Sequence, residues 1–107
     1  MIDPTFDADG YPTEETLQFI EKYQDVHNPR RLVEFIGKAW HWPELAKWDD
    51  KSEVFPATLE LHTGGWSGNE VIVSALERSD SLFWSFYWQK SERGGHYYFE
   101  LPPEKKK

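Results

Sequence analysis

The sequence contains no cysteine, so it forms no disulfide and offers no thiolate for catalysis or metal binding. This absence fits a reducing compartment, and we expect a cytoplasmic protein. No apolar run approaches the ~20 residues that a helix needs to cross a bilayer, and the N-terminus lacks the basic-then-apolar pattern of a signal peptide. We therefore expect no membrane partner.

Basic residues are scarce as well. The chain contains twelve Lys and Arg and nineteen Asp and Glu, which gives a net charge of −7. Residues 1–25 contain seven of the acids but only one lysine. Nucleic-acid binding requires a basic patch, so none is expected. The three lysines at 105–107 are interpreted as a solvated tail, too short to reverse this conclusion.

Aromatic residues are abundant by contrast. Six Trp, five Tyr and seven Phe in 107 residues are far more than a disordered chain carries, so a packed core is expected. The length corresponds to one domain over residues 1–107, with an acidic entry segment over 1–12 and a tail over 102–107.

The first half of the chain predicts helices. One helix is predicted to begin at Thr13, where two glutamates follow in the first turn, and its apolar stripe continues to His27. A second is predicted over residues 29–41, because Asn28-Pro29 is a favourable helix start. Two further segments complete this half: a short helical turn over 45–48 and an exposed linker over 49–53.

The second half predicts strands around one helix. Residues 55–62 alternate apolar and polar side chains, as a strand does. Ser67, followed three residues later by Glu70, matches a capping box and predicts a helix over 68–79. Two more strands are predicted over residues 82–89 and 96–101, joined as a hairpin through Arg93-Gly94-Gly95.

Together these elements predict an α+β fold, with two N-terminal helices followed by β-α-β-β. The helix over 68–79 would cross between parallel strands, with a right-handed connection. The strand over 96–101 would pair antiparallel with the one over 82–89. The expected sheet is therefore small, three-stranded and mixed, with the helices packed on one face.

The stretch from Glu60 to Glu70 joins these elements and is the first candidate for function. Gly64, Gly65 and Gly68 allow positive φ or close backbone approach, and a strand, a glycine-rich turn and a helix start expose backbone amides that suit an anion. The spacing matches neither a P-loop nor the dinucleotide motif. A capped turn without a ligand remains an alternative.

The face of the predicted sheet away from the helices collects polar side chains. Its members are Thr58, Glu60, His62, Ser85, Tyr87, Gln89, His96, Tyr98 and Glu100. A solvated sheet face is the simple interpretation, whereas hydroxyl, carboxylate, imidazole and phenol groups side by side also suit a binding or acid–base surface.

His62 and His96 are predicted at strand ends, with Glu60 on the same side as His62. Such a set suits a zinc site or a general base, but the spacing is less specific than His-Glu-x-x-His, and we expect no metal ion and no cofactor. Neither Ser67 nor Ser85 lies in the G-x-S-x-G turn of a nucleophile elbow.

Trp66 and Arg93 are the remaining candidates. Trp66 suits an interface anchor or folds back over the sheet edge, and Arg93 suits a clamp for a carboxylate or phosphate, with a solvated loop arginine as the simpler interpretation. The candidate binding residues are Gly64, Gly65, Trp66, Ser67, Asn69, Glu70, Tyr87, Arg93, His96 and Tyr98.

Residues 63–70 (TGGWSGNE) and 93–97 (RGGHY), together with the opening 9–15 (DGYPTEE), carry a resemblance that extends over most of the chain. The sequence resembles a family of small acidic proteins of bacterial genomes, phages and mobile elements. The resemblance implies a bacterial or phage cytoplasmic protein, and it supplies no activity and no catalytic residue.

Three functions follow as hypotheses. The first is a small non-enzymatic binding protein that holds a protein partner or a small anionic ligand on the glycine-rich turn and polar sheet face. The second is an acidic, phage-type inhibitor of a basic host defence protein or nuclease. The third is a small hydrolase or transferase with His62 or His96 as base.

Overall fold

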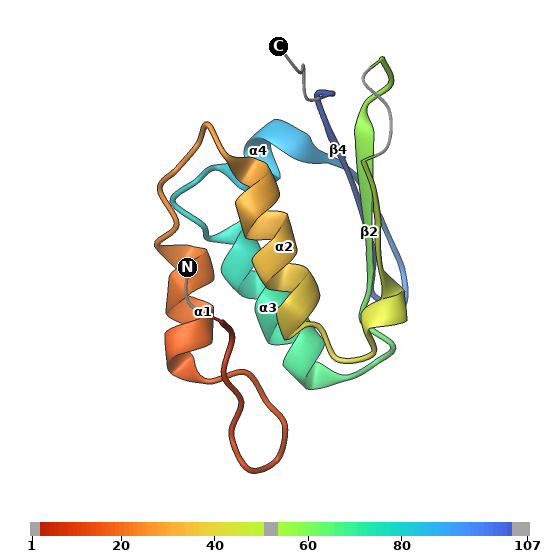
Figure 1. The fold of residues 1–107 in the computed structure, drawn as a ribbon. Coiled ribbons are helices and arrows are strands. Elements are labelled where there is room, and N and C mark those ends of the chain that lie inside the picture. Colours follow the sequence, from red (N-terminus) through yellow and green to blue (C-terminus); the bar gives the residue numbers. More distant parts are fainter. Residues whose placement is uncertain (1–2, 51–53, 104–107) are drawn as a thin grey trace.

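The computed structural model describes residues 3–50 and 54–103, and this part of the chain forms two layers (Figure 1). Helices cover one face of a four-stranded antiparallel sheet, so the α+β class is confirmed. The described helices are α1 (Glu14–Glu21), α2 (Pro29–Ala39), α3 (Ser67–Glu77) and α4 (Phe83–Tyr87), with a 3-10 turn, η1 (Pro43–Leu45). The described strands are β1 (Ala46–Asp49), β2 (Ala57–His62), β3 (Trp88–Glu92) and β4 (His96–Leu101).

The two N-terminal helices form where the sequence predicts them. Thr13 is the N-cap of α1 and its side chain accepts from the Thr16 amide, while α2 begins with a proline in its first turn. The first helix ends at Glu21, earlier than expected, and His27 lies exposed beyond it.

The predicted three-stranded mixed sheet is wrong. The strand order is β1-β2-β4-β3, and every neighbouring pair is antiparallel. β2 pairs with β4 instead of with the strand predicted over 82–89, and the hairpin partner β3 lies at the edge. The hairpin of β3 and β4 is confirmed, and β1 forms the opposite edge where a helical turn was expected.

The strand predicted over 82–89 is mostly a helix. Leu82 adopts a left-handed conformation with φ 59°, the next five residues form α4, and the strand begins only at Trp88. The alternating aromatic pattern indicated the wrong period: α4 buries Phe83 and leaves Phe86 60% exposed, and Trp88, the first residue of β3, is 43% exposed. Apolar alternation over a short run does not distinguish strand from helix.

Helix α3 is confirmed, but the capping box that predicted it is wrong. Trp66 occupies the N-cap position and makes no side-chain capping bond. Ser67 lies inside the helix, and its Oγ is 2.8 Å from the hydroxyl of Tyr11.

The core lies between the helical layer and the sheet. Its largest fully buried apolar side chains are Ile20, Leu32, Phe35, Ile36, Leu59, Leu61, Ile72, Leu76, Phe83, Phe99 and Leu101. At roughly 1.5–3 kcal/mol for each large apolar side chain, their burial dominates the favourable free energy of folding.

Arg30 connects the start of α2 to the residues that directly follow β1 and β4. Its guanidinium forms two bonds to the Asp50 carboxylate, of 2.8 and 3.0 Å, and donates to the carbonyl of Pro102. None of the helices over residues 3–50 and 54–103 is both long enough and apolar enough to span a bilayer. The lysine tail at 105–107 and positions 51–53 of the expected linker lie outside the described residues.

Candidate functional site

The candidate site lies on the face of the sheet that the helices leave open. The register of β2 and β4 sets Thr58 opposite Glu100, Glu60 opposite Tyr98, and His62 opposite His96. Side chains directly opposite one another on antiparallel strands share a face, so the predicted grouping of these residues is confirmed. Ser85 and Tyr87 were wrongly placed here, because both belong to α4.

His62 and His96 form a direct contact, with their Nδ1 atoms 2.7 Å apart. On its other side, Nε2 of His62 lies 3.2 Å from Oε1 of Glu60. An ionised carboxylate only accepts, so in the neutral pair Nε2 of His62 carries the hydrogen and its Nδ1 accepts from Nδ1–H of His96. With this assignment, Nε2 of His96 in the neutral pair carries no hydrogen and can accept a hydrogen bond, and it lies beside Gly94.

The two diglycine turns meet next to this pair. The Thr63 amide donates to the Gly95 carbonyl over 2.9 Å, which joins the turn after β2 to the loop before β4. Gly64, Gly65, Gly94 and Gly95 all have positive φ, between 64° and 92°. The glycine turns and the two imidazoles therefore lie beside one another at one rim of the sheet.

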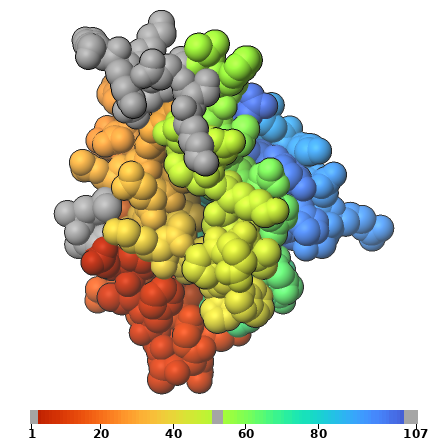
Figure 2. Space-filling view, turned by 45° about the vertical axis from the view of Figure 1, so that its right-hand side comes forward, coloured from red at the N-terminus to blue at the C-terminus, as the bar shows by residue number. Residues whose placement is uncertain are grey.

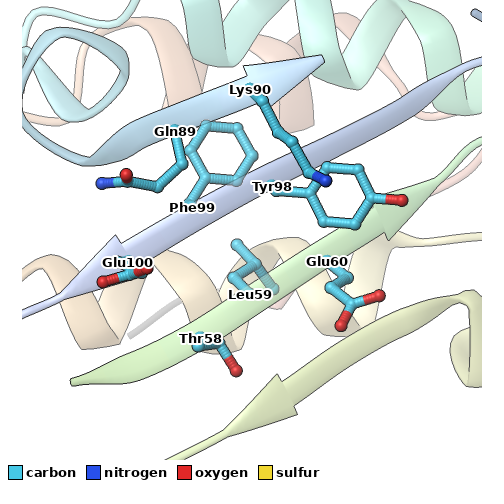
Figure 3. A pocket seen from close by; sticks show the side chains of 8 residues that line it. All are labelled: Thr58, Leu59, Glu60, Gln89, Lys90, Tyr98, Phe99 and Glu100. Carbon is cyan, nitrogen blue, oxygen red and sulfur yellow. The ribbon is translucent and has the colours of Figure 1, made fainter. Parts of the chain in front are cut away.

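A groove of about 400 Å³ lies on the open face (Figure 3). The side chains that line it on this face are Thr58, Glu60, Gln89, Lys90, Tyr98 and Glu100. Two carboxylates face one ammonium group, so the groove favours a cationic group over an anionic one.

Tyr98 organises one side of the groove. The Lys90 ammonium lies 4.7 Å from the centre of the Tyr98 ring, and the Tyr98 hydroxyl donates to Glu92 over 2.7 Å. That hydrogen bond, helped by the charge of Lys90, holds the pKa of the Glu92 carboxyl below its ordinary value. The same bond raises the pKa of the Tyr98 phenol.

Lys90 and Glu92 were missed as members of this face. They alternate along β3, opposite Tyr98 and His96 of β4. Simple alternation could not have placed them on this face, because the register shifts between Trp88 and Lys90: Trp88 lies opposite the buried Phe99, whereas Lys90 lies opposite Tyr98.

Several predicted binding residues lie elsewhere. Trp66 and Ser67 lie at the start of α3, where Trp66 contacts Tyr11 and His41. Glu70 is exposed in the first turn of α3, and Arg93 is exposed in the hairpin loop beside the rim.

Asn69 has a structural role in the core. It is fully buried, its Oδ1 accepts from the His41 amide, and its Nδ2 donates to the carbonyls of His41 and Thr63. These three bonds join the end of α2 to the turn after β2, so Asn69 holds two backbone segments in place.

The histidine pair does not form a metal site with the carboxylates around it. The donor atoms of Glu60, His62 and His96 bond to one another in sequence, and residues 3–50 and 54–103 contain no group of three or more His, Cys, Asp or Glu side chains able to hold a metal ion.

Comparison of the chain with family models, with curated proteins and with solved structures gives no match. The resemblance to small acidic bacterial and phage proteins therefore stays a prediction.

Proposed function

We propose that the protein is a small non-enzymatic binding protein that engages a protein partner through the open face of its sheet. The observation that carries the proposal is a groove of about 400 Å³ on a sheet face that the described helices leave uncovered. Ligand sites are concave and hold a few convergent polar groups, which is the character of this groove.

The charge of the groove supports a basic partner. Glu60 and Glu100 line it against Lys90, and the whole chain has a net charge of −7. A complementary field steers association and suppresses partners of the same charge. A basic host nuclease or defence protein, expected from the sequence, belongs to this class of partner, and a small anionic ligand fits the groove less well.

A peptide titration tests this proposal. The probe is acetyl-Gly-Arg-Gly-Arg-Gly-amide, compared with its glutamate counterpart, and the measurement is the shift of backbone amide signals in ¹H–¹⁵N spectra. We expect the arginine peptide to move the signals of Thr58, Lys90 and Tyr98, and the glutamate peptide to leave them unmoved.

Glu60→Gln should reduce those shifts, whereas Glu34→Gln, at an exposed position of α2, is the matched control and should not. Equal shifts with both peptides, or equal effects of both substitutions, would refute the proposal.

One observation favours a second candidate, a hydrolase or transferase. The carboxylate of Glu60 and the two imidazoles form a hydrogen-bonded chain that ends at His96, the arrangement of a general base oriented by a second group. Ser67 and Ser85, which the sequence did not favour as nucleophiles, lie in α3 and α4 and not on this face.

Hydrolysis of p-nitrophenyl acetate tests this candidate. The rate should fall in His96→Ala and remain in His27→Ala, where the replaced imidazole is exposed beyond α1. Identical rates in the two variants would exclude His96 as a base in this reaction.

A further inference from the structure

Four aromatic rings from three separate segments form a row beside the start of α3. Tyr11 lies 4.8 Å from Trp66, Trp66 lies 4.4 Å from His41, and His41 lies 4.4 Å from Trp42, measured between ring centroids. We call Tyr11, His41, Trp42 and Trp66 the aromatic ledge. In Figure 2 the surface of residues 40–45, in yellow, lies beside the N-terminal loop, in red.

Two glycines of the segment 63–70 provide the space for the ledge. A Cβ on Gly64 would lie 2.8 Å from the Trp42 ring, and a Cβ on Gly68 would overlap the ring of Trp66. The glycine spacing that suggested an anion-binding turn therefore has another physical cause: each of these glycines lets an indole ring lie against the backbone.

The backbone at Trp42 is strained. Its φ is 61°, a conformation that costs an ordinary residue about 1–2 kcal/mol, and the side chain that it places remains 41% exposed. Strained backbone conformations cluster at functional positions.

The neighbourhood of the ledge is acidic. Within four residues of its members along the chain there is one basic residue, Lys38, which pairs with Asp3. The acidic residues within the same distance are Asp7, Asp9, Glu14, Glu15, Glu44 and Glu70, and all six are exposed. Asp7 is held next to the first ring, because its Oδ1 accepts from the backbone amide of Tyr11 over 3.0 Å.

We propose that the aromatic ledge binds an arginine-bearing segment of a basic protein partner, as a contact surface separate from the sheet groove. A guanidinium group stacks on aromatic faces and pairs with carboxylates, so it matches both properties of this surface. An anion would be repelled by the carboxylate of Asp7 and by the other acids that flank these residues in the sequence, and a neutral sugar would use the rings but gain nothing from the negative charge.

The indole N–H signals of the tryptophans provide the test. Acetyl-Gly-Arg-Gly-Arg-Gly-amide is titrated against the full chain and followed in ¹H–¹⁵N spectra, with the signals assigned by single Trp→Phe variants. We expect the signals of Trp42 and Trp66 to move. Trp40 is the internal control, because its Nε1 donates to the His62 carbonyl and its ring is 3% exposed.

The matched variants are Trp42→Ala and Trp88→Ala, since the two rings are 41% and 43% exposed and neither change alters the charge. The first should weaken binding of the arginine peptide by about threefold to fivefold, and the second should leave it unchanged. A peptide with citrulline in place of arginine should not move the two indole signals.

Several results would overturn the proposal. Equal affinities in the two variants would show that net charge alone attracts the peptide, and citrulline or maltopentaose shifts as large as those with arginine would show a neutral ligand. Glu60→Gln separates the two sites: it should suppress the groove shifts and leave those of Trp42 in place. The proposal for one surface can therefore be refuted while the proposal for the other is supported.

Discussion

Gly95→Ala tests the contact that joins the two diglycine turns. Gly95 has a φ of 84°, and a Cβ there would overlap the side chain of Thr63, which is completely buried. The substitution therefore imposes two costs at once, backbone strain and overpacking against a side chain that has no space to move.

Gly65→Ala is the matched control, since it imposes only the first cost. Its φ is 77°, but nothing lies within 4 Å of an added Cβ. A left-handed conformation costs about 1–2 kcal/mol in both variants. Overpacking adds about 1–3 kcal/mol for Gly95 alone. We expect total losses of about 2–5 kcal/mol for Gly95→Ala and about 1–2 kcal/mol for Gly65→Ala.

Urea unfolding followed by tryptophan fluorescence measures both losses as free energies of unfolding. The restriction that alanine imposes on the unfolded chain is common to the two variants, so their difference isolates the clash with Thr63. A domain stability of 5–15 kcal/mol leaves both variants folded enough to measure. If the two losses agree within about 0.5 kcal/mol, the Thr63–Gly95 contact is not as tight as described.

Two further changes give separate tests. Asn69→Ala removes the side-chain partner of the His41 amide and of the His41 carbonyl, and it removes one of two donors to the Thr63 carbonyl, which still accepts from the Trp66 amide. It should cost about 2–4 kcal/mol in urea unfolding, whereas Asn28→Ala, at an N-cap without a side-chain bond, should cost less than about 1 kcal/mol. Tyr98→Phe removes the hydrogen bond that lowers the pKa of Glu92 from its ordinary 4.5, so an NMR titration of the Glu92 carboxyl should show that pKa rising. A Glu92 pKa that is lower in the folded than in the unfolded state stabilises the fold at pH values above the unfolded-state pKa. That contribution is lost as the pH falls through the folded-state pKa. Between about pH 5 and 3, the free energy of unfolding should therefore fall less in Tyr98→Phe than in the native chain.

The sequence was most informative where local chemistry and tertiary packing agree. Asn28-Pro29 started a helix, and the alternation over 57–62 marked which side chains of β2 are buried. The glycine pairs correctly indicated tight turns, and His62 and His96 were correctly predicted at strand ends, although the pairing that brings them together could not be derived from the sequence.

The predictions from the sequence were wrong where the structure depends on which strands pair and on contacts between distant segments. Strands β2 and β4 are separated by α3, α4 and β3, and no local pattern specifies that they pair. The aromatic run over 82–89 fits a strand by alternation, whereas residues 83–87 form a helix that buries Phe83 in the core. The role of Asn69 depends on His41, 28 residues away, so its exposure could not be judged from its neighbours.

The two outer strands also bear on how the protein behaves at high concentration. An open sheet border is a template on which other chains can aggregate, and short or charged border strands guard against this. Here β1 has only four residues, and β3 carries Lys90 and Glu92, which pair within the strand over 3.7 Å. A chain so rich in aromatic residues can thus leave one sheet surface uncovered and still resist stacking into fibrils.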